Sequence, residues 1–128
     1  MADWRLNLFL EGYLAISESG KEVEGRVPDP SNPEKDYSKI NVGDRVIFIP
    51  VERSFAKITG FHDMVFPVIY NRPYKSAEEM LRGEGLRRVL PGIKSIEQGV
   101  QVYHSLPGYL ERIKLHGIHA IGLGKRLS

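Results

Sequence analysis

The stretch SGKEVEGR at residues 19–26 decides the fold of this chain. The segment Lys21–Val27 alternates between two faces, with Val23 on one side and Glu24 and Arg26 on the other. A period of two residues is typical of a strand, because successive side chains of extended backbone point to opposite faces. The stretch therefore predicts a loop that leads into a strand.

The preceding segment predicts a strand followed by a helix. Trp4–Leu10 alternates apolar and polar side chains, which is typical of a half-buried strand. From Glu11 the pattern changes to the helical spacing of Tyr13 and Ile16. Gly20 can end this helix, because glycine readily adopts the left-handed conformation at a helix C-terminus. We therefore expect a short helix directly before the 19–26 stretch.

The following segment predicts a surface loop and then three strand-like runs. Val27–Ile40 contains several prolines, which neither a helix interior nor a central strand tolerates. Arg45–Pro50 is an apolar run and predicts a strand that is buried on both faces. Ser54–Phe61 and Met64–Tyr70 also have strand-like composition. A glycine and a proline interrupt these two runs, so they predict a bent or bulged hairpin.

The C-terminal half predicts short helices and a closing strand. Ser76 and Ser95 each stand three residues before a Glu or Gln, which is the capping-box pattern of a helix start. The first of these helices is expected to end near Arg82, and a further turn is expected at Leu86–Leu90. Gly117–Leu123 predicts a last strand. About five or six strands with short flanking helices predict an α+β fold.

The composition indicates a single globular domain over residues 1–128. The chain is 41% hydrophobic and 27% charged, and no polar linker divides it. Cysteine is absent, which excludes disulfides and thiolate metal sites. No apolar run approaches the roughly 20 residues that span a bilayer, and the N-terminus lacks a signal-peptide pattern. We therefore expect a cytoplasmic protein without membrane contact.

The charge of the chain is unevenly distributed, although the net charge is only +2. Residues 1–64 carry 8 Lys or Arg against 11 Asp or Glu, whereas residues 65–128 carry 10 against 5. A basic half can attract phosphates, because nonspecific nucleic-acid binding needs a concentrated positive field. Composition alone leaves open the alternative that these charges are scattered over a solvated surface.

Lys21, Glu24 and Arg26 form the sharpest candidate site. Glu24 and Arg26 share a strand face, and Lys21 reaches the same region from the preceding loop. Two cations with one carboxylate suit a phosphate or carbonyl oxygen, since arginine offers a planar fork, lysine a point charge, and glutamate an orienting group or proton acceptor. The alternative from spacing alone is an exposed row of ion pairs.

The pattern Lys-x-x-Glu-x-Arg at these three positions resembles the signature of the ASCH domain, a relative of the PUA fold. Further segments match in the same order, at residues 41–48, 74–92, 103 and 117–121. The resemblance covers about residues 8–123. It implies a single ASCH-like domain with a small PUA-like β-barrel, a cleft lined by the three charged side chains, and an RNA-related role.

The sequence also departs from the family pattern. Ser19 stands where the family has glycine, and Ala77 replaces a common aromatic residue. One branch of small bacterial ASCH-like proteins hydrolyses the amide of acetylated cytidine and carries threonine at the position of Glu24. The chain lacks that hydroxyl, but Glu24 could act as a base on water while Lys21 stabilises an oxyanion. The same branch implies Glu84 as a second acid, and the alternative is a solvated turn residue.

Side chains of the 72–94 region extend the expected RNA interface. Arg72, Lys75 and Arg82 could contact a phosphate backbone, and Tyr74 and Tyr103 could stack on bases. The alternatives are a solvated helix surface for the cations and packing roles for the tyrosines. The whole group of cations comprises Arg72, Lys75, Arg82, Arg87, Arg88 and Lys94.

No cofactor and no metal are predicted. His116 and His119 have a spacing that invites a metal, but an i to i+3 pair on a strand faces opposite sides. Phosphate-binding glycine loops and Ser-His-Asp patterns are absent. The sequence therefore favours an RNA-binding domain that captures a nucleotide or an RNA segment. The alternative is a hydrolase acting on RNA or on a modified nucleoside such as acetylated cytidine.

Overall fold

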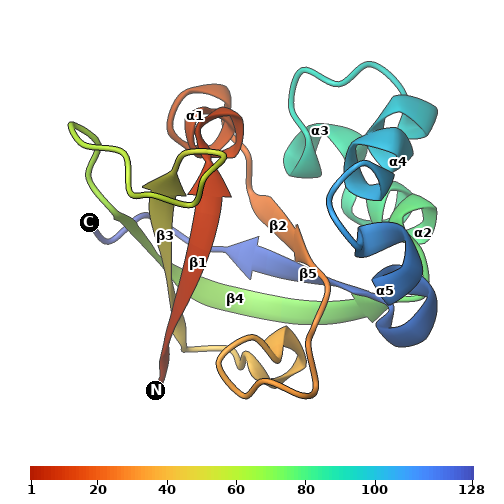
Figure 1. Ribbon diagram of the computed structural model, residues 1–128, viewed down its shortest axis with the longest axis horizontal. Helices are drawn as coiled ribbons and strands as arrows, with labels where there is room; N and C mark the ends of the chain where they lie inside the picture. Colours follow the sequence, from red (N-terminus) through yellow and green to blue (C-terminus); the bar gives the residue numbers. More distant parts are fainter.

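The computed structural model describes residues Met1–Ser128 and has an α+β architecture (Figure 1). Its strands are β1 (Asp3–Phe9), β2 (Val23–Arg26), β3 (Arg45–Val51), β4 (Met64–Tyr74) and β5 (Ile118–Leu123). Its helices are α1 (Leu10–Ser19), α2 (Ala77–Glu84), α3 (Leu86–Val89), α4 (Ile96–His104) and α5 (Tyr109–His116), with a 3-10 turn η1 (Tyr37–Lys39). No helix is long and apolar enough to cross a lipid bilayer.

The five strands form one mixed sheet in the order β1-β3-β4-β5-β2. The sheet curls into a half-barrel, and the register shift between Val68 and Tyr70 of β4 marks an irregularity in the long central strand. β1 and β3 are parallel, whereas the other pairs are antiparallel. The predicted α+β class is therefore confirmed, but the half-barrel is not a closed barrel.

The N-terminal unit agrees with the sequence pattern. Leu6 and Leu8 of β1 are buried, as alternation predicts, and Leu6 lies opposite Phe48 of β3. α1 ends at Gly20, whose φ of 75° is left-handed and whose N–H donates to the carbonyl of Ala15. The strand, the helix and its glycine C-cap are confirmed.

The segments around β3 differ from the prediction. β3 is a strand, but Ile47 and Ile49 are only partly buried, so it is not fully buried on both faces. The strand predicted at Ser54–Phe61 is wrong, because this segment is a loop joined to the sheet by one bridge between Val51 and Lys57. Phe55 has a φ of 68°, a left-handed conformation that interrupts extended backbone.

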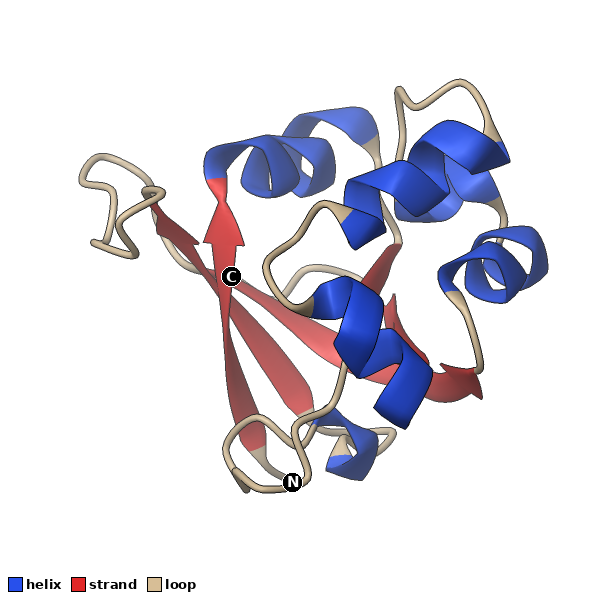
Figure 2. Cartoon of the chain, turned by 45° about the vertical axis from the view of Figure 1, so that its right-hand side comes forward, coloured by secondary structure: helices blue, strands red, loops and turns tan.

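Helices α2, α3, α4 and α5 gather on one side of the sheet (Figure 1 and Figure 2). The hydroxyls of Ser76 and Ser95 accept from the N–H groups of Glu79 and Gln98, each at 3.1 Å, and so cap α2 and α4 as predicted. α5 was not predicted, since its N-cap residue, Gly108, has no side chain to signal a helix start.

α2 extends beyond its predicted end at Arg82. It continues through Gly83 to Glu84, although glycine weakens a helix interior. At Gly83 a Cβ would lie 2.7 Å from the hydroxyl of Tyr74, so the glycine permits close packing between α2 and β4. This extension buries Glu84 at the helix end.

Each face of the sheet carries a hydrophobic core. Inside the curl, 13 buried residues from the strands, α1 and the 37–40 region form one cluster that includes Phe48 and Ile121. On the outer face, 10 buried residues join the helices to the sheet, among them Val23, Met80 and Ala120. Burying one large apolar side chain contributes about 1.5–3 kcal/mol, so both cores stabilise the fold.

Candidate functional site

β1 and β2 are the two edges of the half-barrel, and α1 connects them. β2 pairs with β5 so that Glu24 lies opposite Ile121 and Arg26 opposite His119. Ile121 belongs to the inner core, whereas Val23 belongs to the outer core. Glu24 and Arg26 therefore face the inside of the curl. We use the term seam for the region between these edges, from Asn7 on β1 to residues 21–26.

Lys21, Glu24 and Arg26 converge at the seam into a chain of ion pairs, which we term the seam triad. Lys21 Nζ lies 2.7 Å from Glu24 Oε1, and Arg26 Nε lies 2.7 Å from Glu24 Oε2. The side chains of Lys21 and Glu24 are each 7% exposed, and that of Arg26 is 14% exposed. The row of ion pairs considered as the alternative thus exists, but it is buried rather than exposed.

Arg26 also spans the gap between the two sheet edges. Its Nη2 donates a hydrogen bond to the backbone carbonyl of Asn7 on β1 at 2.7 Å. Its guanidinium carbon lies 5.9 Å from the centroid of the Tyr37 ring, within the range of a cation–π contact. A side chain therefore links β1 to β2 where a closed barrel would use backbone pairing.

The seam triad is electrostatically unbalanced, because two cations share one carboxylate. Burial acts to raise the pKa of Glu24, but the charges of Lys21 and Arg26 and their hydrogen bonds hold it below its usual value. Burial acts to lower the pKa of Arg26, but the Glu24 carboxylate raises it above its usual value. Glu24 is thus ionised near neutral pH, and because it pairs with two cationic side chains, one positive charge remains uncompensated within the triad.

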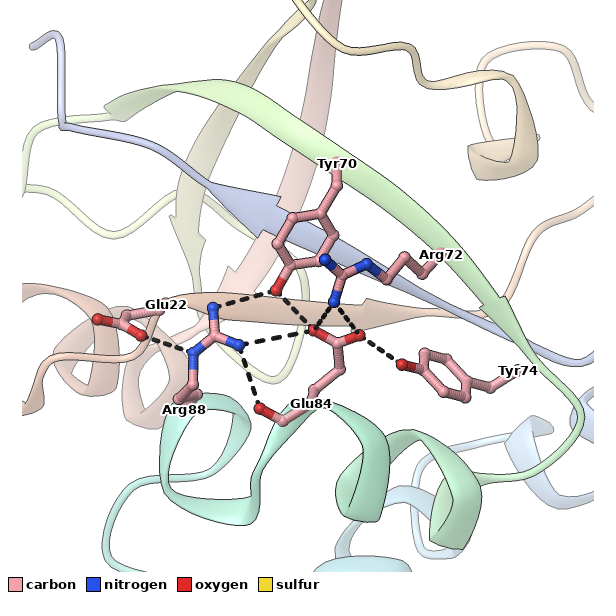
Figure 3. A network of polar contacts seen from close by, with 6 residues as sticks. All are labelled: Glu22, Tyr70, Arg72, Tyr74, Glu84 and Arg88. Atoms are coloured by element: carbon pink, nitrogen blue, oxygen red, sulfur yellow. Dashed lines mark hydrogen bonds and ion pairs between the residues drawn. The ribbon is translucent and has the colours of Figure 1, made fainter.

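A second buried carboxylate, Glu84 at the end of α2, has its own set of partners (Figure 3). The hydroxyls of Tyr70 and Tyr74 donate to its two carboxylate oxygens, both at 2.5 Å. Arg72 Nη1 donates to Oε2 at 3.2 Å, and Arg88 Nη1 lies 3.8 Å from Oε1. The Glu84 side chain is 0% exposed. We term these five residues the Glu84 network.

The hydrogen bonds keep Glu84 ionised despite its burial. Burial acts to raise its pKa, but hydrogen bonds from Tyr70, Tyr74 and Arg72 hold it below its usual value. Burial and the neighbouring carboxylate raise the pKa of both tyrosines, so their hydroxyls remain donors. The carboxylate is therefore saturated by groups of the chain itself.

The Glu84 network lies on the opposite face of the sheet from the seam triad. Tyr70 is paired with Gly122, which is in turn paired with Val23 of the outer core. The structure therefore does not bring Glu84 to Glu24, and the two acids do not form the expected pair in one cleft. The alternative of a solvated turn residue is also wrong, because Glu84 is buried.

Arg88 connects the Glu84 network to the loop that carries Lys21. Its Nε donates to Glu22 Oε2 at 2.7 Å, and its backbone carbonyl accepts from the Glu22 N–H at 2.8 Å. Its Nη2 also donates to the hydroxyl of Tyr70 at 3.1 Å. Sequence patterns placed Arg88 only in a group of cations, since the contact with Glu22 spans 66 residues.

Arg82 and Lys75 lie away from the seam triad, whereas Tyr103 packs beside it against Gly25. Arg82 pairs with Glu78 at 3.0 Å on the exposed side of α2, and Lys75 is exposed between β4 and α2. Tyr103 is buried, and a Cβ added at Gly25 would lie only 2.6 Å from its hydroxyl oxygen. The tyrosine therefore has the packing role considered as the alternative to base stacking.

Asn71 and His119 are polar residues near the triad; sequence patterns did not identify Asn71, and they raised His119 only in a metal pair that was rejected. His119 lies opposite Arg26, and its Nδ1 is 2.8 Å from Asn71 Oδ1. The Asn71 amide nitrogen donates to the carbonyls of Tyr37 and Ile40 at 3.0 and 2.9 Å. Alternation can assign a strand residue to a face, but no local pattern supplies the register between β2 and β5.

Two surface grooves lie away from the seam triad. One of about 760 Å³ lies between α2 and α4, where Arg82 and Gln101 are among its lining residues. The other, of about 330 Å³, is lined by Phe9, Arg53 and neighbouring residues. No group of three or more histidine, aspartate or glutamate side chains is arranged to hold a metal ion.

Two solved structures resemble the chain over nearly its whole length, although no protein-family model and no curated protein matches it. The crystal structure of hypothetical protein PH0355 has a TM-score of 0.76 and 34% identity, covering 98% of this chain and 99% of that one. The solution NMR structure of protein PF0455 from Pyrococcus furiosus has a TM-score of 0.68 and 32% identity, covering 98% of each chain. The chain therefore belongs to the same family as PH0355 and PF0455.

Proposed function

We propose that the protein is an RNA-binding domain whose seam captures a nucleotide or an RNA segment. The observation that carries this proposal is the convergence of Lys21, Glu24 and Arg26, with ion-pair distances of 2.7 Å and little exposure. Buried ions cost several kcal/mol each unless they are well paired, so a buried triad with an excess cation is a candidate binding site. The ASCH-like motif supports RNA as the ligand.

Arg26 retains hydrogen-bonding capacity for such a ligand. Its Nε and Nη2 are used by Glu24 and by the Asn7 carbonyl, whereas its Nη1 makes no hydrogen bond within the chain. Asp63 Oδ1 is the only buried side-chain polar atom without a hydrogen-bond partner, so Arg26 Nη1 is reached by solvent. In this proposal Glu24 holds the geometry, while Arg26 and Lys21 contact phosphate or base oxygens.

Hydrolysis of RNA or of acetylated cytidine is the weaker candidate. A carboxylate held between two cations with a lowered pKa is a poor proton acceptor, which weighs against Glu24 as a general base. The second acid expected at Glu84 lies on the other face of the sheet, where it accepts hydrogen bonds from Tyr70, Arg72 and Tyr74 and pairs with Arg88. These features favour binding over catalysis.

The binding proposal is tested by fluorescence anisotropy with a short labelled single-stranded RNA. Lys21→Met removes one charge of the triad, and Lys114→Met is the matched control, because Lys114 is 66% exposed on α5. Loss of a charge-assisted hydrogen bond should weaken binding by about 10–100-fold in Lys21→Met. The slope of log affinity against log salt concentration should also decrease in magnitude by about one. Equal affinities of the two variants would contradict the proposal.

The same proteins separate binding from hydrolysis. Wild type is incubated with acetylated cytidine and with the labelled RNA, and products are separated by chromatography. We expect salt-sensitive binding without turnover. Turnover that disappears in Lys21→Met but persists in Lys114→Met would replace the binding proposal with the hydrolase.

A further inference from the structure

We infer that His119 is the hydrogen-bond acceptor of the seam, fixed in its Nδ1–H tautomer by Asn71, and that together with Arg26 it contacts the edge of an RNA base. The nature of the ligand rests on the proposed function. The tautomer of His119 does not, because it follows from contacts within the chain.

The orientation of the Asn71 amide is determined by two backbone groups. One amide nitrogen lies 3.0 Å from the Tyr37 carbonyl and 2.9 Å from the Ile40 carbonyl. Both carbonyls are acceptors only, so the group that faces them must be the NH₂ donor. The oxygen of the Asn71 amide therefore points to the other side, where it lies 2.8 Å from His119 Nδ1.

This orientation determines which nitrogen of His119 carries the proton. Asn71 Oδ1 can only accept, so His119 Nδ1 must donate to it. A neutral imidazole carries one proton, and the hydrogen bond at one nitrogen fixes the state of the other. His119 Nε2 is therefore left with a free lone pair, which makes it an acceptor.

The free nitrogen of His119 is available to a ligand beside Arg26. Nε2 makes no hydrogen bond within the chain, and Asp63 Oδ1 is the only buried side-chain polar atom without a hydrogen-bond partner. Nε2 is therefore reached by solvent, as is Arg26 Nη1. Arg26 and His119 are directly paired across β2 and β5, where opposing Cβ atoms are about 4.5–5.5 Å apart. Arg26, with a free donor, and His119, with a free acceptor, thus occupy paired positions on the inner face of the sheet.

The surroundings of His119 favour its neutral form. Burial lowers its pKa, and Asp36, which precedes η1, partly opposes this effect. On β2 the cross-strand neighbour of His119 is Arg26, with Glu24 next along the same face, and the partner of the ring on β4 is the uncharged Asn71. The imidazole is therefore an acceptor at neutral pH, and protonation at lower pH would convert Nε2 into a donor.

An acceptor beside a guanidinium suits a nucleobase better than a phosphate. Phosphate oxygens are acceptors, so they can use Lys21 and Arg26 but have no proton to offer the His119 lone pair. The Watson–Crick edge of each RNA base places an acceptor next to an N–H donor. The seam thus offers a phosphate contact at Lys21 and a base contact at Arg26 and His119.

The tautomer is tested on the unliganded wild-type protein by long-range ¹H–¹⁵N correlation NMR of the imidazole rings. At about pH 7.5 we expect His119 Nδ1 to be protonated and Nε2 to be unprotonated. Protonation at Nε2 instead would overturn the inference, whether or not the protein binds RNA.

The base contact is tested by comparing a short single-stranded RNA of mixed sequence with an abasic oligonucleotide of the same length. His119→Phe should weaken binding of the RNA about fivefold, the value of one neutral hydrogen bond, and leave binding of the abasic probe unchanged. His116→Phe is the matched control, because His116 is exposed at the end of α5.

The outcomes distinguish this inference from the proposed function. If wild type binds neither probe, the proposed function fails and the base contact fails with it. If wild type binds RNA and His119→Phe binds it equally well, the base contact alone is overturned. A pH series gives a second reading. As His119 becomes protonated, wild type should lose part of its preference for the RNA over the abasic probe, whereas His119→Phe should show no such change.

Discussion

Glu24 and Glu84 are both buried carboxylates with lowered pKa values, but they are stabilised in different ways. Glu24 is held by two cations that are themselves 7% and 14% exposed. Glu84 is held by two tyrosine hydroxyls and by arginines that are 53% and 41% exposed. Glu84 is thus saturated by neutral donors and solvated cations, whereas Glu24 belongs to a buried cluster with an excess positive charge.

The comparison indicates which carboxylate is structural and which belongs to a binding site. The Glu84 network joins α2 and α3 to β4, and both carboxylate oxygens of Glu84 have donors within the chain. The seam triad leaves an Arg26 N–H without a hydrogen-bond partner, and His119, paired with Arg26 across the sheet, leaves one ring nitrogen free. Unused hydrogen-bonding groups at a partly buried site favour a ligand there.

The largest expected effect is the loss of stability in Glu24→Gln. The substitution keeps the size of the side chain but leaves Lys21 and Arg26 as buried cations without a counter-charge. Breaking a buried pair in this way should lower the free energy of unfolding by about 3–5 kcal/mol, measured by urea denaturation. A loss below about 1 kcal/mol would mean that the two cations are solvated and that the comparison fails.

Glu84→Gln should have a smaller effect on stability. An amide oxygen can still accept from one tyrosine, and the partly exposed Arg72 and Arg88 can turn to water. We expect a decrease of about 1–3 kcal/mol in the same urea experiment. A loss larger than that of Glu24→Gln would reverse the ranking of the two sites. RNA affinity should be nearly unchanged in this variant.

The pH dependence of stability should reflect both buried carboxylates, because each has a lowered pKa. A folded-state pKa below the unfolded value of about 4.3 gives stability that is present above pH 4.3 and is lost as the pH falls through the folded value. Unfolding free energy in wild type should therefore decrease on acidification below about pH 4. Over an accessible pH range each carboxylate titrates only in part, so the loss should be smaller than that caused by either substitution. Urea titrations at several pH values should show a shallower decrease in both glutamine variants.

Arg82→Ala is expected to have the smallest effect. Its partner Glu78 is 59% exposed and Arg82 itself is 64% exposed, so solvent screens the pair. The change in unfolding free energy should lie within about 0.5 kcal/mol. RNA binding should also be unchanged if the seam, rather than the outer side of α2, is the interface. A clear loss of RNA affinity would move the interface to the helices.

Local signals in the sequence predicted much of the fold. Gly20, Ser76 and Ser95 mark helix ends by their own backbone and side-chain chemistry, and the structure uses all three as expected. The alternation that placed Glu24 and Arg26 on one strand face is also a local signal. The failures occurred where local signals were weak, as at α5, or misleading, as in the 54–61 loop.

Nonlocal features of the site could not be predicted in this way. The pairing of Arg26 with His119 and the contact of Arg88 with Glu22 depend on sheet register and helix packing, which join residues far apart in the chain. Glu84 was expected beside Glu24. The register of β2, β4 and β5 instead places Glu24 on one face of the sheet and Tyr70 and Tyr74, which hold Glu84, on the other. The sequence therefore identified the local cluster of Lys21, Glu24 and Arg26 but not its neighbours from distant parts of the chain.

The most direct test of the seam as the binding site is a ¹H–¹⁵N NMR titration of wild-type protein with a short single-stranded RNA. The account predicts that the largest chemical-shift changes occur at the amides of residues 21–26 and at His119, with little change at Tyr74 and Glu84. Changes confined to α2 and α3, or no change at all, would contradict it.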